Sequence, residues 1–285
     1  MTPFDYHAPK TMRSAMRLVQ EFGDDAKVLA GGHSLIPSMK LRLAAPSVII
    51  DLGGIAGLKR VTAGDETITI GALATHYAVE SHRLLPSKCS LLPETAAEIG
   101  DAQVRNRGTV GGSIAHADPA ADWPATMLAL DAQFDIAGPN GERAVAASDF
   151  FVDLFITDLQ PDEVLTGIRI ATPPENSGGA YVKMRQSASG FALAGVAAHV
   201  TLDDAGNCAS VAVGVTGVAP AAYRAHAVED ALVGQGIDAV ADAAAQAADG
   251  VEEFQEDHHA SGDYRAHLAR VFAQRALSRA IERAA

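Results

Sequence analysis

Apolar side chains recur about one helical turn apart near the amino terminus, and short extended runs follow. Residues 9–22 carry such a stripe, formed by Met12, Met16, Leu18, Val19 and Phe22. Thr11 is a candidate N-cap and Gly23 a candidate stop, so the pattern predicts one helix. Short apolar runs bounded by glycine or polar residues predict strands at 26–30, 47–52, 67–70, 134–138, 149–155 and 164–170.

Three more helices are expected in the first half of the chain. Gly71 and Thr75 lead into the first. The second covers 92–106 and leads into a basic segment that ends at Gly108, and the third covers 118–130, with Pro119 in its first turn. The segment ATPPENSGG at 171–179 combines prolines, glycines and small polar residues. Because such residues favour turns and loops, this segment is the best candidate for a domain boundary.

Beyond this boundary the pattern changes to three extended segments followed by helices. Residues 181–186, 192–202 and 210–218 read as antiparallel strands, with a hairpin turn at 203–207 between the last two. Helices are expected at 226–233, 237–248 and 264–284. The chain is therefore predicted to be an α+β protein with a carboxyl-terminal three-stranded antiparallel sheet backed by helices.

The composition is typical of a soluble globular protein, with 48% hydrophobic and 20% charged residues among 285. No apolar run is long enough to span a membrane, and no signal-peptide layout is present. Cys89 and Cys208 are too few to hold an iron–sulfur cluster or a structural zinc, and they favour a reducing, cytoplasmic setting. The net charge of −13 disfavours nucleic acid as a partner.

Two glycine pairs carry the candidate chemistry. One lies in VLAGGHS at 28–34, and the other in RNRGTVGGSIAHADPAAD at 105–122. Paired glycines allow tight bends with positive φ, and consecutive N–H groups in such bends bind anions. Two bends that converge on adjoining phosphates predict a dinucleotide ligand.

Other nucleotide, metal and nucleophile motifs are missing. The chain has no G-x-G-x-x-G, Walker, H-E-x-x-H or C-x-x-C sequence, and neither Ser34 nor Ser113 lies in G-x-S-x-G. The adjacent His258 and His259 have no spaced partners and are interpreted as a solvated approach to a helix. No metal site and no catalytic acid, base or nucleophile of the chain's own is predicted.

The glycine segments, together with PSMKLRL after AGGHS and the tail SGDYRAHLARVFAQRAL, resemble one family from Pro3 to about Arg283. This is the FAD-binding medium subunit of the molybdenum hydroxylases, which includes flavoprotein components of carbon monoxide, xanthine and N-heterocycle dehydrogenases. The resemblance implies a two-part FAD-binding (PCMH-type) domain, at 1–56 and 57–175, and a carboxyl-terminal flavoprotein domain at 176–285.

The resemblance also implies sixteen residues that bind FAD non-covalently. The backbone of the first segment would wrap the pyrophosphate, with Ala30, Gly31, Gly32, His33, Ser34 and Leu35. The second segment would form the second wall, with Thr109, Gly111, Gly112 and Ser113. Many relatives have Asn or Asp in place of Ser113, which is shorter. His116 and Asp118 would line the same loop, and Asp122 would lie near the adenosine end. Leu165 would lie near the flavin, Lys183 at its pyrimidine edge and Phe191 against its face.

Several of these residues have a second interpretation. Thr109, Ser113 and Asp122 are also suited to capping a helix or turn. Lys183 alternates with apolar neighbours and so could point to solvent, and Phe191 is equally suited to a hydrophobic core. Some related flavoproteins attach flavin covalently to histidine, whereas His33 is expected to hydrogen-bond nearby backbone.

The implied role is electron transfer within a complex. A large molybdopterin subunit would hydroxylate the substrate, and a small subunit with two [2Fe-2S] clusters would pass electrons to FAD on this chain, as a dimer of heterotrimers. One alternative is a free-standing flavin oxidoreductase, for which Tyr181, Arg185 and His199 are candidate acid–base residues. Another is an assembly module that has lost FAD. The substrate and the electron acceptor stay open.

Overall fold

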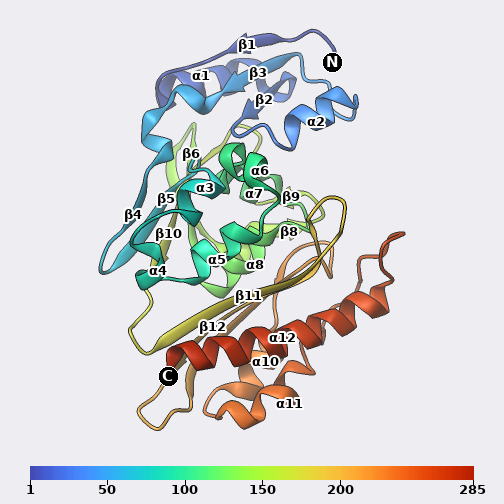
Figure 1. The fold of residues 1–285 in the computed structure, drawn as a ribbon. Helices are drawn as coiled ribbons and strands as arrows, with labels where there is room; N and C mark the ends of the chain where they lie inside the picture. Colours follow the sequence, from blue (N-terminus) through green and yellow to red (C-terminus); the bar gives the residue numbers. More distant parts are fainter.

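Three sheets follow one another down the long axis of the molecule in the computed structural model, which describes residues 1–285 (Figure 1). The first sheet is parallel, in the order β1-β3-β2, with β1 at Asp5–His7, β2 at Ala26–Leu29 and β3 at Val48–Asp51. The helix α1 (Met12–Phe22) begins at a capping box on Thr11 and ends at Gly23, as predicted. It buries Ala15 and Val19 against the sheet. The short helix α2 covers Leu35–Lys40.

The second sheet is antiparallel, in the order β4-β5-β10-β6-β7. Its strands are β4 (Val61–Ala63), β5 (Thr67–Gly71), β6 (Gln133–Gly138), β7 (Gly141–Ala146) and β10 (Val164–Ala171). Helices pack beside it: α3 (His76–Glu80), α4 (Leu85–Lys88), α5 (Leu91–Glu98), α6 (Ala102–Arg107), α7 (Val110–His116), α8 (Asp122–Ala129) and α9 (Ala147–Phe150). A hairpin of β8 (Phe151–Asp153) and β9 (Ile156–Thr157) extends from it. Short 3₁₀ turns cover Gly23–Asp25, Leu52–Gly54, Ala56–Lys59 and Ile237–Ala239.

The carboxyl-terminal sheet has four strands, so the prediction of three was wrong. Its order is β11 (Ser177–Arg185), β12 (Ala192–Leu202), β13 (Cys208–Thr216) and β14 (Tyr223–Arg224). The two-residue β14 is too short for any periodic pattern to reveal it. One face is covered by α12 (Gly262–Ala284), with α10 (His226–Leu232) and α11 (Val240–Ala244), while α5 and α8 pack on the other (Figure 1).

Four predicted elements begin, break or change type at other places. The helix expected at 92–106 is two helices, because Gly100 has a φ of 49° and Asp101 caps α6 by accepting from the Val104 N–H at 2.8 Å. The segment 149–155 ends a short helix before it becomes extended, and 237–248 is a 3₁₀ turn followed by α11. The helix expected from 118 begins only at Asp122.

Residues 118–121 are used instead to hold the carboxyl-terminal sheet. The Pro119 carbonyl accepts from the Gly217 N–H at 2.7 Å and from the Thr216 hydroxyl at 2.8 Å, and the Ala192 N–H donates to Ala120 at 3.1 Å. We propose the division 1–56, 57–175 and 176–285, with each sheet inside one part. No helix of the structure combines the length and hydrophobicity that crossing a bilayer requires.

Candidate functional site

The two glycine segments, far apart in sequence, lie against each other. A Cβ on Gly31 would overlap the Arg107 carbonyl oxygen and would lie 2.9 Å from Gly108 Cα and 3.0 Å from the Thr109 nitrogen. Only glycine permits this approach of two backbones. The segments after β2 and before α7 therefore share one crevice.

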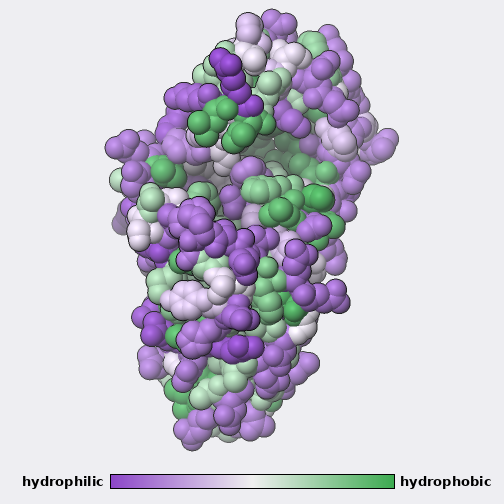
Figure 2. Space-filling view, turned by 90° about the vertical axis from the view of Figure 1, so that its right-hand side faces the viewer, coloured by the Kyte–Doolittle hydropathy of each residue, from purple (hydrophilic) through white to green (hydrophobic).

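This crevice is a cavity of about 700 Å³, within the usual size of a small-molecule site. Figure 2 shows the molecule hollowed below its amino-terminal part, with hydrophobic residues on both sides of the hollow. Every residue predicted to bind the cofactor lines the cavity except Lys183: Ala30, Gly31, Gly32, His33, Ser34, Leu35, Thr109, Gly111, Gly112, Ser113, His116, Asp118, Asp122, Leu165 and Phe191. Lys27 is the single lysine or arginine among the lining residues.

The first glycine segment offers a run of free backbone donors. The N–H groups from Gly31 to Ser34 donate to no acceptor in the protein. Gly32 has a φ of 77°, which turns the chain sharply before α2 begins at Leu35. Successive N–H groups in such a turn form a concave site for an anion. His33 Nδ1 lies 3.2 Å from the Gly31 carbonyl, the local contact expected of it.

The second glycine pair is not a bend, and the expectation of free donors there was wrong. Gly111 and Gly112 lie in the first turn of α7, and the Gly111 N–H donates to the Ala72 carbonyl at 2.9 Å. The Gly112 N–H donates to the Thr109 hydroxyl at 3.2 Å, so Thr109 caps the helix. This segment therefore contributes close packing and hydroxyl groups, while the free N–H groups come from the first.

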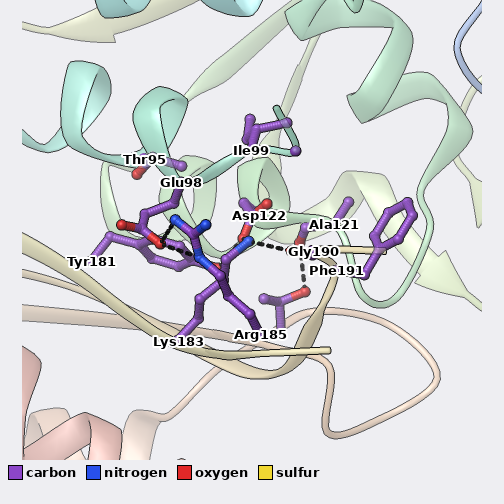
Figure 3. Close-up of polar contacts among 12 residues, drawn as sticks. Thr95, Glu98, Ile99, Ala121, Asp122, Tyr181, Lys183, Arg185, Gly190 and Phe191 are labelled. Atoms are coloured by element: carbon purple, nitrogen blue, oxygen red, sulfur yellow. Dashed lines mark hydrogen bonds and ion pairs between the residues drawn. The ribbon is translucent and has the colours of Figure 1, made fainter. Parts of the chain in front are cut away.

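Asp122 and Lys183 form a buried ion pair at one end of the cavity (Figure 3). Lys183 Nζ lies 2.8 Å from Asp122 Oδ1 and donates to the Gly190 carbonyl at 2.8 Å. Its side chain has no exposed surface, so the alternative that it points to solvent was wrong. Ala121, not Asp122, is the N-cap of α8. Because the pair is in contact, the two residues cannot mark opposite ends of an extended dinucleotide, and that part of the prediction was wrong.

Tyr181 completes this buried group. Its hydroxyl donates to Asp122 Oδ1 at 2.6 Å, and burial raises the Tyr181 pKa well above its usual range, so the proton stays on the phenol. Burial also raises the pKa of Asp122, against the opposing effects of the Lys183 ammonium and the Tyr181 hydroxyl. Lys183 therefore supplies no uncompensated positive charge to the cavity.

Two aromatic side chains lie at the cavity wall near solvent. Phe191 follows Gly190, lines the cavity and is 43% exposed, which rules out the core interpretation (Figure 3). Phe155, in the β8–β9 hairpin, packs 5.1 Å from the His116 ring and is half exposed. Phe155 was not predicted, because one apolar residue in a loop carries no periodic signal.

The residues considered for an independent active site do not form one. None of Tyr181, Arg185 and His199 lines the cavity. Arg185 pairs at the surface with Glu98 at 2.6 Å, and His199 Nε2 is enclosed without a partner. The chain holds no group of three or more histidine, cysteine or acidic residues placed to bind a metal. The buried cavity-wall residue His76 was also missed, because no motif announces its contact with the buried Trp123.

Comparison with known protein families identifies the family to which the chain belongs. Residues 2–173 match the FAD binding domain in molybdopterin dehydrogenase, and residues 179–280 match the CO dehydrogenase flavoprotein C-terminal domain. The chain belongs to this flavoprotein family. As a member of it, the chain carries an FAD-binding domain and is of the oxidoreductase class, as the resemblance implied.

Three members of this flavoprotein family match over nearly their whole length. The carbon monoxide dehydrogenase medium chain of Afipia carboxidovorans is 38% identical, with 99% of this chain and 98% of the relative covered. A chain of carbon monoxide dehydrogenase from Hydrogenophaga pseudoflava superposes with a TM-score of 0.95 at 40% identity, covering 100% and 99%. A chain of quinoline 2-oxidoreductase from Pseudomonas putida 86 gives 0.91 at 32% identity, covering 99% and 98%.

Proposed function

We propose that this chain is the FAD-binding electron-transfer subunit of a molybdenum-containing hydroxylase. Its FAD would take electrons from [2Fe-2S] clusters of a small partner subunit and pass them to an external acceptor. A large molybdopterin subunit would oxidise the substrate, in a cytoplasmic dimer of heterotrimers. The observation that carries this proposal is the cavity built where two glycine segments meet, with a run of free N–H groups on one wall.

The cavity wall suits a diphosphate bound largely by neutral donors. The N–H groups of Gly31, Gly32 and His33 donate to no acceptor of the protein, and the hydroxyl residues Ser34 and Thr109 also line the cavity. Hydrogen bonds from backbone N–H groups to an anion are stronger than those to neutral acceptors. The diphosphate would therefore lie between the two segments, without a cluster of lysines or arginines.

The other end of the cavity suits the flavin ring. Leu165 and Phe191 offer apolar surface in the cavity wall, and the Asp122–Lys183 pair fixes the loop at Gly190, which also lines the cavity. FAD, when bound, supplies the redox chemistry, while the chain binds and orients it. Asp122, held by Lys183 and Tyr181, would accept a hydrogen bond from a hydroxyl or N–H of the cofactor.

The partner subunits are inferred from whole-chain likeness to medium chains. The named relatives act on different compounds, including carbon monoxide, caffeine and 6-hydroxypseudooxynicotine. A flavin subunit that only relays electrons would serve all of these, because the substrate binds elsewhere. We therefore propose no substrate for the complex from this chain.

Purification with the neighbouring encoded subunits tests the proposal. The expected product is a yellow three-subunit complex that releases FAD on acid treatment and whose flavin is reduced when substrate is added to the large subunit. Flavin reduction by a substrate on the isolated chain would favour a free-standing oxidoreductase instead. A colourless complex that contains no FAD would refute the proposal.

A further inference from the structure

His76 is a nearly buried histidine at the cavity wall whose ring is held from one side only. It is 4% exposed, begins α3, and its backbone N–H donates to the Gly108 carbonyl at 3.0 Å. The indole Nε1–H of Trp123, the chain's one tryptophan, donates to His76 Nδ1 at 3.0 Å. An indole N–H can only donate, so Nδ1 must be the unprotonated nitrogen and Nε2 must carry the proton.

The proton on Nε2 has no acceptor within the protein. The enclosed side-chain atoms without a partner are His199 Nε2 and Arg265 Nε, so His76 Nε2 retains open surface. His76 lines the cavity where the glycine segments meet, and a Cβ on Gly108 would lie 2.7 Å from His76 Nε2. The donor therefore opens to the cavity beside the residue that precedes Thr109, where the two glycine segments meet.

The ring also stays neutral. Burial, with the nearby His33 and Arg105, lowers the pKa of His76 to about 4. The Arg105 guanidinium is itself engaged, because it donates to Glu80 at 2.7 Å and to the Ile99 carbonyl at 3.1 Å. A neutral imidazole of fixed tautomer adds a donor to the cavity without adding charge.

We infer that His76 is a cofactor-binding residue, whose Nε2–H donates a hydrogen bond to an acceptor oxygen of the bound dinucleotide beside Gly108, with Trp123 as the positioning residue that sets the tautomer. This inference rests on the proposed function. It explains why a buried polar ring with an unpaired donor lies in the wall of the cavity.

Two substitutions separate the donor from the shape of the ring. In His76→Asn the amide oxygen lies as many bonds from Cβ as Nδ1 does, so it can still accept from Trp123, but the Nε2 donor is lost. In His76→Gln the amide nitrogen reaches the position of Nε2 and keeps the donor. His82→Asn is the matched control, because His82 is half-buried, lies six residues away and is outside the cavity.

The measurement is FAD titration of the apoprotein, in the full chain or in the complex, whichever binds FAD. We expect His76→Asn to weaken FAD binding about tenfold to a hundredfold, as for loss of one hydrogen bond to a charged group. Trp123 emission in the FAD-free protein should be unchanged, and His76→Gln and His82→Asn should bind near the wild-type level. Nitrogen NMR of the wild type should show Nε2 protonated, and Trp123→Phe should mix the two tautomers.

Two results would overturn the inference while leaving the proposed function intact. One is wild-type FAD affinity in His76→Asn. The other is equal weakening of FAD binding in His76→Gln and His76→Asn, which would mean that packing of the imidazole ring, not its Nε2 donor, determines FAD affinity. A wild-type protein that takes up no FAD in either preparation would instead overturn the proposed function, and the inference with it.

Discussion

Replacing Gly31 by alanine puts a methyl group where the two glycine segments touch. The new carbon would overlap the Arg107 carbonyl oxygen and lie 2.9 Å from Gly108 Cα, whereas ordinary contact begins at 3.4 Å. The segments would have to part by at least 0.5 Å, and both neighbours are backbone, so no side chain can rotate away. Overpacking of this kind costs about 1–3 kcal/mol. The same shift would stretch several hydrogen bonds to a diphosphate together, so we expect FAD content to fall sharply.

The assay compares Gly31→Ala with Gly57→Ala by urea unfolding and by flavin absorbance per protein. A Cβ on Gly57 meets nothing within 4 Å, and neither glycine has a positive φ, so the pair differs in contact rather than in backbone strain. Gly57→Ala should be as stable as the wild type or more stable by about 0.4–1 kcal/mol, with full FAD. If Gly31→Ala kept both wild-type stability and wild-type FAD content, the reasoning that convergence of the segments makes the site would be refuted.

Three further outcomes follow from buried groups. Asp122→Asn leaves the Lys183 ammonium buried without its partner, so it should lower the free energy of unfolding in urea by about 3–5 kcal/mol. The control Asp65→Asn removes an exposed pair with Lys88 and should leave stability unchanged. Equal effects of the two substitutions would argue against the buried pair. The pKa of His76 is near 4 when folded against an ordinary 6.5, so the unfolded chain takes up the proton first as the pH falls. The free energy of unfolding of the wild type should therefore decrease by up to about 3 kcal/mol between pH 6.5 and 4, and that of His76→Asn should decrease less steeply. Parallel curves of unfolding free energy against pH for the two proteins would contradict this. Burial raises the Cys89 pKa to about 12, so alkylation at pH 8 followed by mass spectrometry should label Cys89 only in unfolded protein.

Much of the site could be predicted because its residues lie in two continuous segments. VLAGGHS and RNRGTVGGSIAHADPAAD each place several wall residues in a row, so the family resemblance carried by these two segments was enough to name them. What the glycines do differs between the segments. Gly32 makes a bend, whereas Gly111 and Gly112 begin a helix, and paired glycines fit both conformations.

Contacts between distant segments could not be predicted. Lys183 and Asp122 are brought together by β11 and α8, and nothing in either segment names the other. His76 and Trp123 meet across 47 positions for the same reason. The start of α8 was misplaced because Pro119 suits a helix's first turn as well as it suits the loop that holds Thr216 and Gly217.

The hydrogen bonds from Thr216, Gly217 and Ala192 to residues 119–121 have a consequence for how the protein is made. The loop that they fix leads directly into Asp122, yet two of its anchors, Thr216 and Gly217, are added to the growing chain almost a hundred residues later. Until about residue 217 has left the ribosome, these hydrogen bonds cannot all form. Uptake of the flavin nucleotide should therefore be a late event, completed after synthesis of the last domain, and shortened chains that stop before this point should remain colourless.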